Sequence, residues 1–351
     1  MEPQYTHVEL LTLNGPEYRR VSTAPPRPPT DEEIPIVDLA PIDGDPAARA
    51  QLAHQVRAAA QTTGFFYIKN HGIPPELIES ALSQAKAFFH QPEELKDDKV
   101  SKLKLMHMDG YHAVGTTQVN KTETKDRKET FTLRYNARND PTQARDSALA
   151  WDDSPLWAGT AHLPHFRDTT IAFWQARLAL ARKMVQIFAL ALDLPETYFD
   201  EVVTHPGSDG LYVHYPGTPT ADHLAKDAVD IDVGIGSHTD IQCFTLLWQD
   251  MSGGLQVLSA ADEWLDARPI PGTLVVNIGD FLQRLSNNRF RSTVHRVYNR
   301  QTTSRYSMPF FLGFNPESVC RVLPSCVDEE HPALYEPISC GERVTVSHNV
   351  S

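Results

Sequence analysis

Residues 236–248 read Gly-Ser-His-Thr-Asp-Ile-Gln-Cys-Phe-Thr-Leu-Leu-Trp, and this stretch decides the fold class of the chain. Its β-branched and aromatic residues predict a β-strand. Similar short runs, broken by Gly, Pro and Asn, recur after residue 205: 211–215, 254–258, 273–278, 291–298 and 306–314. Several short strands with turn residues between them are typical of a sandwich or a barrel. The second half of the chain therefore predicts a jelly roll.

The first 200 residues have a more helical pattern. Residues 1–30 are polar and end in a Pro-rich run, which predicts an extended arm. Strands and helices are then predicted at 34–39, 46–61, 64–68, 77–89 and 168–193. Residues 93–127 are charged and irregular and predict a loop, and Asp168 is the expected N-cap of the longest helix. The predicted fold is mainly β with helices: a jelly-roll core preceded and flanked by α-helices.

The composition excludes several classes of function. The 32 basic and 45 acidic residues give a formal net charge of −13, which disfavours binding to nucleic-acid phosphates. No segment reaches the roughly 18 uncharged apolar residues of a membrane helix, and the N-terminus lacks the pattern of a secretion signal. Four irregularly spaced cysteines indicate a reducing compartment. We expect a cytoplasmic protein with no nucleic-acid, membrane or obligate protein partner.

Three residues form a candidate metal site. On a strand, His238 and Asp240 would project from the same face, because residues two apart share a face. His295, in the strand pattern of residues 288–297, would supply a third ligand from a neighbouring strand. Two imidazoles and one carboxylate form the facial triad of non-haem Fe(II) oxygenases. The alternative is a surface turn, since a His-x-Asp pattern alone is common by chance.

Arg305 and Ser307 form a candidate anion site ten residues beyond the last of these ligands. They again lie two residues apart, so both side chains would share one face of a strand. The forked, permanently charged guanidinium and the hydroxyl suit a buried carboxylate. The apolar residues 308–312 predict a packed strand, which favours a buried arginine over the alternative of an exposed one on an edge strand.

These motifs in this order resemble the 2-oxoglutarate/Fe(II)-dependent oxygenases of the isopenicillin N synthase-like superfamily, which includes plant and fungal metabolite oxidases. The resemblance covers most of the chain and rests on segments 35–39, 64–73, 128–131, 212–216, 238–240, 253–257, 277–280, 287–297 and 305–307. It divides the chain into five regions of one compact unit: an arm at 1–33, an N-terminal dioxygenase region at 34–135, linking helices at 136–204, the jelly-roll core at 205–317 and a C-terminal segment at 318–351.

The resemblance also implies roles for individual residues. His238, Asp240 and His295 would be the catalytic iron ligands. Arg305 and Ser307 would hold the distal carboxylate of 2-oxoglutarate, and Tyr215 would hydrogen-bond to the same carboxylate unless it only packs beside Pro216. The implied cofactors are Fe(II), 2-oxoglutarate as co-substrate and O2, with ascorbate as a candidate reductant.

The implied activity is oxidation of a C–H bond with release of succinate and CO2. The same ligands serve hydroxylation, desaturation, ring expansion and cyclisation, so the outcome stays open. The last fifty residues contain no glutamine, which disfavours the penicillin-forming reaction, where a C-terminal glutamine is an extra ligand. Two alternatives remain: a cupin-like Zn or Mn hydrolase or isomerase, and an ascorbate-type oxidase that does not use 2-oxoglutarate.

The resemblance further indicates a substrate pocket. Family substrates lie beside the strand before the first ligand and the strand that carries the arginine. The matching residues are Phe131, Leu211, Val213 and Phe311, with Tyr111 and His112 from a candidate lid at 105–112. Because this set is largely apolar, we expect a small, largely apolar secondary metabolite.

Overall fold

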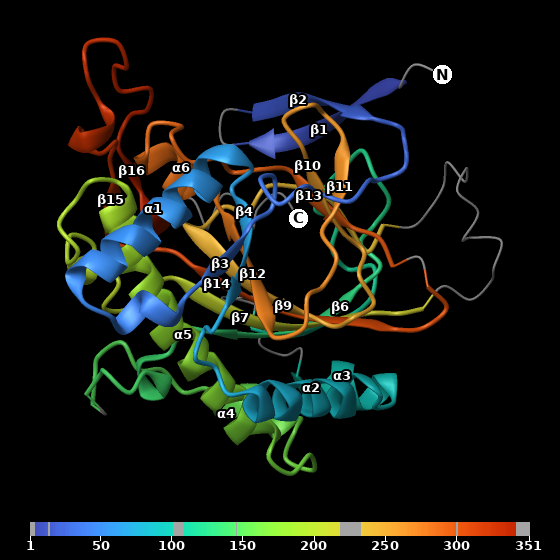
Figure 1. Ribbon diagram of the computed structural model, residues 1–351. Coiled ribbons are helices and arrows are strands. Elements are labelled where there is room, and N and C mark those ends of the chain that lie inside the picture. Colours follow the sequence, from blue (N-terminus) through green and yellow to red (C-terminus); the bar gives the residue numbers. More distant parts are fainter. Residues whose placement is uncertain are drawn as a thin grey trace.

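The computed structural model describes residues 4–12, 15–100, 109–144, 146–217, 233–299 and 301–341. Within them, two β-sheets face each other, and helices cover the outside of the larger sheet (Figure 1). The larger sheet has the strand order β3-β4-β12-β9-β14-β7-β6-β5, and the smaller one has the order β11-β10-β13-β8. Two facing, mainly antiparallel sheets are the architecture of a jelly roll, so the predicted fold class is confirmed.

The strands have the following bounds. The larger sheet contains β3 (Ile36–Asp38), β4 (Phe65–Lys69), β5 (Gly110–His112), β6 (Glu129–Arg134), β7 (Ser208–Tyr215), β9 (Phe244–Gln249), β12 (Thr273–Ile278) and β14 (Arg305–Leu312). The smaller sheet contains β8 (Ile235–His238), β10 (Leu255–Leu258), β11 (Trp264–Asp266) and β13 (His295–Val297). Two separate pairs are β1 (Tyr5–Thr12) with β2 (Gly15–Ser22) and β15 (Val319–Cys320) with β16 (Ile338–Ser339).

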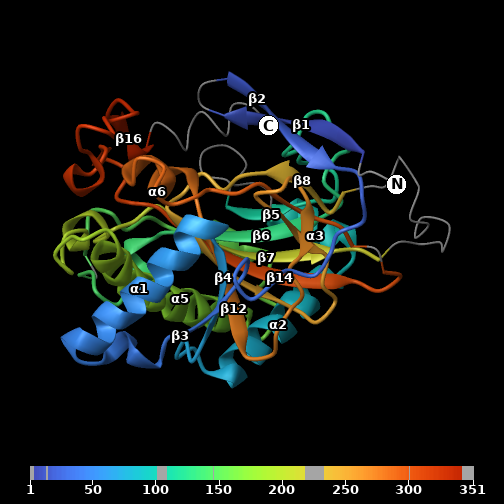
Figure 2. The ribbon, with the colours of Figure 1, turned by 45° about the horizontal axis from the view of Figure 1, so that its top comes forward.

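The helices are α1 (Pro46–Thr62), α2 (Pro75–Phe89), α3 (Glu93–Val100), α4 (Ser154–Ala158), α5 (Phe166–Ala191) and α6 (Asp280–Leu285). In Figure 2, α1, α2 and α5 lie on the side of the larger sheet away from β8 of the smaller sheet, whereas α6 lies level with β8. Short 3-10 turns occupy Ala40–Asp43, Ala137–Asn139, Asp200–Val202 and Pro324–Cys326. None of the helices in the described part of the chain is long and apolar enough to cross a membrane.

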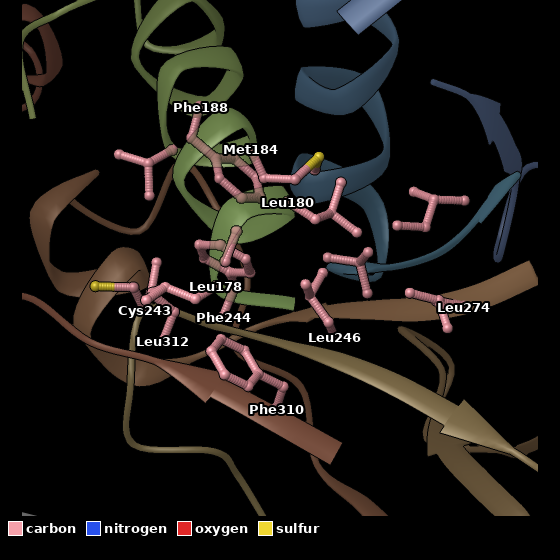
Figure 3. Packing of buried hydrophobic residues seen from close by; sticks show 14 of the residues in the cluster. Leu178, Leu180, Met184, Phe188, Cys243, Phe244, Leu246, Leu274, Phe310 and Leu312 are labelled. Atoms are coloured by element: carbon pink, nitrogen blue, oxygen red, sulfur yellow. The ribbon is translucent and has the colours of Figure 1, made fainter. Parts of the chain in front are cut away.

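The larger sheet is buried on both faces. Its outer face packs against α5, where Phe188, Met184 and Leu178 meet apolar residues of β9 and β14 (Figure 3). Its inner face contributes Phe65, Val275 and other residues to a second cluster with the smaller sheet. Each fully buried side chain of this size stabilises the fold by about 1.5–3 kcal/mol. The alternation of side chains along a strand thus separates an outer core under the helices from an inner group of side chains between the two sheets. The region between the two sheets is called the inner chamber below.

The stretch 236–248, predicted as one strand, forms two. β8 ends at His238 in the smaller sheet, and β9 starts at Phe244 in the larger one, so the residues between them cross from sheet to sheet. The crossing passes close to Gly279, where a Cβ atom would lie 2.0 Å from the carbonyl oxygen of Gln242. Only glycine fits beside this turn.

Three other local predictions were wrong. Where an extended arm is predicted, β1 and β2 form a hairpin whose Val8, Leu10 and Val21 pack against the smaller sheet. The predicted loop at 93–127 contains α3 and β5. The longest helix starts after His165, which has a φ of 68°, and Asp168 lies in the first turn rather than at the N-cap.

Candidate metal centre and co-substrate site

The three predicted metal ligands lie together at one end of the inner chamber. β13 and β8 pair so that His295 lies opposite His238, and the two ring centroids are 4.2 Å apart. Oδ1 of Asp240 lies 3.7 Å from Nε2 of each histidine. One ligand atom from each residue lies within 4.8 Å of the others. The three side chains can therefore bind one ion.

Hydrogen bonds fix the orientation of each candidate ligand. Nδ1 of His238 lies 2.7 Å from the carbonyl oxygen of Gly236, and Nδ1 of His295 lies 3.1 Å from that of Thr293. An Nδ1–H that donates to a carbonyl leaves the Nε2 lone pair available to a metal. Asp240 therefore faces two imidazole nitrogens that are set up as ligands.

The second carboxylate oxygen of Asp240 is held from the larger sheet. Asn277 of β12 donates a hydrogen bond of 2.7 Å to Oδ2, and Thr245 of β9 donates another to the same atom. Thr245 had no distinctive signal in the sequence, and Asn277, in the family-like segment 277–280, was left open between a supporting role at the site and an ordinary strand position, although the alternation of β9 and β12 points both side chains inward. With Oδ2 occupied, Oδ1 is the oxygen that faces the histidines.

The electrostatics of the site favour a divalent cation. Burial, together with the neighbouring His295, lowers the pKa of His238 to about 4. Burial raises the pKa of Asp240, but the two imidazoles and the bonds from Asn277 and Thr245 outweigh it and hold this pKa below its ordinary value. A neutral His238 beside a carboxylate is the protonation state that a metal ligand set requires.

One guanidinium nitrogen of Arg305 has no hydrogen-bond partner in the part of the chain that the structure describes. The side chain is 1% exposed. Its Nε donates to the carbonyl oxygen of Gly253 at 2.6 Å, and Nη2 donates to Oε1 of Gln249 at 3.0 Å. Nη1 is buried and has no hydrogen-bond partner among the described residues. A buried, charged donor of this kind is costly unless an anion accepts from it, so the site fits a carboxylate.

The other two predicted co-substrate residues share the inner face with Arg305. Ser307 is the next inward residue of β14, and Tyr215 of β7 lies directly opposite Arg305 in the sheet. The Tyr215 ring packs 4.7 Å below the guanidinium carbon. Gln249, which positions the guanidinium, had no distinctive signal in the sequence.

The six predicted substrate residues divide between the two faces of the larger sheet. Leu211 and Val213 of β7 share the inner face with Tyr215, and Phe311 shares it with Ser307. His112 pairs with Thr130, which in turn lies opposite Val213, so this histidine belongs to the same face.

Phe131 and Tyr111 do not belong to this group and are a correction. Phe131 packs against Phe88 and Phe166 in the outer, helix-covered core. Tyr111 lies beside it and donates its hydroxyl to Glu129 at 2.6 Å. Both face away from the chamber, because they occupy the alternate positions of β6 and β5. The candidate lid residues Leu105, Met106 and Met108 lie outside the described residues.

Comparison with known proteins agrees with this geometry. A model for the N-terminal region of non-haem dioxygenases in morphine synthesis matches residues 34–153, and the 2OG-Fe(II) oxygenase superfamily model matches residues 208–314. The chain belongs to the 2OG-Fe(II) oxygenase superfamily. It is an oxidoreductase, a dioxygenase that uses Fe(II), 2-oxoglutarate and O2.

Individual relatives cover nearly the whole chain. The 2-oxoglutarate-Fe(II) type oxidoreductase ppzC of Metarhizium rileyi is 40% identical over 98% of this chain and 94% of its own length. The oxidoreductase hxnY of Emericella nidulans is 34% identical over 90% of each chain. The crystal structure of Neurospora crassa T7H with alpha-KG has a TM-score of 0.74 at 29% identity and covers 91% of this chain and 97% of that one.

Proposed function

We propose that His238, Asp240 and His295 hold the catalytic Fe(II), and that Arg305 binds the distal carboxylate of 2-oxoglutarate with Ser307 and Tyr215. The observation that carries the proposal is the buried Nη1 of Arg305, which has no partner among the described residues. It lies on the same inner face as the hydrogen-bond donors of the metal centre. A dicarboxylic co-substrate between the two sites would satisfy it.

Bound Fe(II), with 2-oxoglutarate and O2, supplies the oxidation of a C–H bond, and succinate and CO2 are released. The residues of the chain bind the metal and the co-substrate and orient them. Thr245 and Asn277 keep Asp240 in one rotamer, and Arg305 fixes the direction of the co-substrate through a charge-assisted bond. The inner apolar cluster excludes water from the chamber.

We also propose that the substrate is a small, largely apolar secondary metabolite. Leu211, Val213 and Phe311 lie on the inner face beyond the co-substrate residues, which supports an apolar binding surface. The class of product follows from the substrate, because the same ligands serve hydroxylation, desaturation, ring expansion and cyclisation. The cytoplasmic location, and the absence of macromolecular partners, stay predictions.

The test measures succinate formation and 2-oxoglutarate binding in the purified protein. His295→Ala should reduce Fe(II)-dependent succinate formation to background, because the site loses a ligand. Arg305→Lys should raise the KM for 2-oxoglutarate at least about tenfold and leave iron affinity unchanged, since a bond to a charged group is worth roughly 1.5–3 kcal/mol. Arg268→Lys is the control, because Arg268 is exposed and pairs with Asp266 at 2.8 Å.

Three results would contradict the proposal. An unchanged KM in Arg305→Lys would place the carboxylate elsewhere. Substrate turnover with Zn(II) or Mn(II) and without 2-oxoglutarate would favour the hydrolase or isomerase. Consumption of O2 that depends on ascorbate but not on 2-oxoglutarate would favour the ascorbate-type oxidase.

A further inference from the structure

A row of inward-facing residues runs across the larger sheet from the metal centre. Strand pairing aligns one residue from each of five neighbouring strands: Asn277, Thr245, Phe311, Asp209 and Arg134. The first two donate to Asp240, so the row begins at the candidate metal site. Adjacent strands lie about 4.8 Å apart, which puts the last two residues roughly 10–15 Å from Thr245 along the sheet. A small organic molecule spans such a distance.

The neighbours of Asp209 and Arg134 show which way these two side chains point. At Gly210, a Cβ atom would lie 2.8 Å from side-chain atoms of Trp174 and Arg177 of α5, so this position faces the helices. Leu133 is buried in the same outer core. Because side chains alternate along a strand, Asp209 and Arg134 face the inner side.

Asp209 and Arg134 form an ion pair at the accessible end of the row. Nε of Arg134 donates to Oδ1 of Asp209 at 3.0 Å, and each side chain is 21% exposed. The charge of Asp209 raises the pKa of Arg134 above its ordinary value, so the guanidinium stays charged. The backbone N–H of Arg134 donates to the buried Asp109 at 2.9 Å, which fixes this end of β6.

The pair has a chemical requirement once a substrate covers it. A hydrocarbon would remove water from two charges without offering a hydrogen bond, which costs free energy. A carboxylate would suit Arg134 but would lie beside the negative charge of Asp209. A group with an acceptor and a donor side by side suits both partners, because the guanidinium donates and the carboxylate accepts.

We propose that Arg134 and Asp209 form the polar end of the substrate site and bind a C=O and an adjacent N–H, as in a cyclic amide. This inference rests on the proposed function and narrows its substrate class to a largely apolar molecule with one amide-type edge. Arg134 donates to the carbonyl oxygen and Asp209 accepts from the N–H. The apolar body then lies along Phe311 and Leu211, with its reacting carbon toward the metal centre.

The test compares ring compounds of one size. Full-length protein loaded with Zn(II) and 2-oxoglutarate is titrated with δ-valerolactam, N-methyl-δ-valerolactam and cyclohexanecarboxylate, and dissociation constants are measured by ligand-observed NMR. The unmethylated lactam should bind about tenfold more tightly than the other two, as expected for one hydrogen bond to a charged group. Asp209→Leu should abolish the preference for the unmethylated lactam over its N-methyl form. Arg134→Leu should weaken the binding of both lactams, because both carry the carbonyl group, and Arg268→Gln should leave the affinities unchanged.

The outcomes separate the inference from the proposed function. Failure of 2-oxoglutarate to bind the Zn(II)-loaded wild type would overturn the proposed function. If 2-oxoglutarate binds, three results overturn only the amide site: equal affinity for both lactams, tighter binding of the carboxylate, or no binding of any ring. A merely structural ion pair would lower the Tm of both variants and leave the affinities for both lactams unchanged. If either leucine variant fails to fold, Asp209→Asn and Arg134→Gln are measured in its place.

Discussion

The two carboxylate oxygens of Asp240 lie in different surroundings. Oδ1 lies 3.7 Å from Nε2 of both histidines, and Oδ2 accepts hydrogen bonds from Thr245 and Asn277. The side chain therefore cannot rotate without breaking these bonds. In the proposed iron site, the ligand oxygen is already in position before the metal arrives, which lowers the entropic cost of binding.

Replacing Asn277 tests this positioning. Asn277→Leu has a similar volume but removes the donor to Oδ2, so we expect metal affinity to fall about 10- to 100-fold. Competition with a chelator measures the change directly. Gln256→Leu is the control, because Gln256 is a buried amide whose partner is Arg296. Equal metal affinity in Asn277→Leu and the wild type would show that the hydrogen bond from Thr245 alone is enough to position Asp240.

At this scale the sequence predicts the candidate metal ligands better than the residues that hold those ligands in place. His238, Asp240 and His295 stand out because their residue types and spacing match a facial triad, and the structure brings them together. Asn277 and Thr245 are ordinary strand residues whose role depends on which strands become neighbours. That pairing is long-range, and no local pattern encodes it.

At the scale of elements, Glu129 joins four segments on the outer side of the larger sheet. It is 4% exposed and accepts from Lys96 of α3 at 2.7 Å, from Tyr111 of β5 at 2.6 Å and from Nδ1 of His214 of β7 at 2.6 Å. Burial alone would raise its pKa, but these three partners lower it below the ordinary value. The ionised carboxylate therefore stabilises the attachment of α3 to the sheet.

Glu129→Gln should lower the free energy of unfolding at neutral pH by about 3 kcal/mol, because it breaks a buried ion pair from one side. A lowered pKa in the folded state gives stability that is present above the ordinary value and lost as the pH falls through the folded value. The difference between variant and wild type should thus shrink in acid. Urea unfolding of both proteins at neutral and at acid pH measures this difference in the free energy of unfolding.

A surface ion pair provides the control for this prediction. Lys183 and Asp43 lie 2.6 Å apart, with side chains 44% and 66% exposed. Asp43→Asn should cost at most about 1 kcal/mol. A loss in Glu129→Gln no larger than this would mean that the network contributes little.

The misplaced Phe131 and Tyr111 also have an explanation at this scale. The alternation in β6 separates Phe131 and Leu133 from Thr130 and Thr132, but both faces of the sheet are buried. An apolar face would ordinarily point to the chamber. Here the larger apolar core lies under the helices. The alternation therefore showed correctly which residues share a face of the sheet, but not which face points toward the smaller sheet.

At the scale of the whole molecule, the stability should depend on pH through Asp109. Burial raises the pKa of Asp109 to about 7, so the folded state holds a proton that the unfolded chain releases near 3.8. The stabilising contribution of protonated Asp109 is therefore fully present below the pKa of the unfolded chain, and it is lost as the pH rises to about 7. Asp109→Asn keeps an oxygen for the N–H of Arg134 and should remove this part of the slope. Exposed Asp31→Asn is the control.

Thermal or urea unfolding from about pH 4 to pH 8 measures the effect. The Asp109→Asn protein should gain stability relative to wild type as the pH rises, by up to roughly 4 kcal/mol at the alkaline end. Parallel stability curves for the two proteins would show that the pKa of Asp109 in the folded state equals its ordinary value.

The overall architecture was predictable because its signals are repeated many times. Short strands with turn residues, and helices with a clear apolar face, each contribute a weak indication of the same fold. The hairpin of β1 and β2 was missed because its apolar residues, Val8, Leu10 and Val21, are few and are covered by distant residues such as Trp264. Only the folded molecule supplies that partner.

The crossing between β8 and β9 has a consequence for the lifetime of the protein. His238 and His295 belong to the smaller sheet, and Thr245 and Asn277 belong to the larger one. Asp240 lies between them. A cation in the proposed site would therefore link the smaller sheet to the larger one. Binding energy of this kind adds to resistance against opening and proteolysis. The iron supply of the cell would then set how long each copy survives, as well as how fast it works.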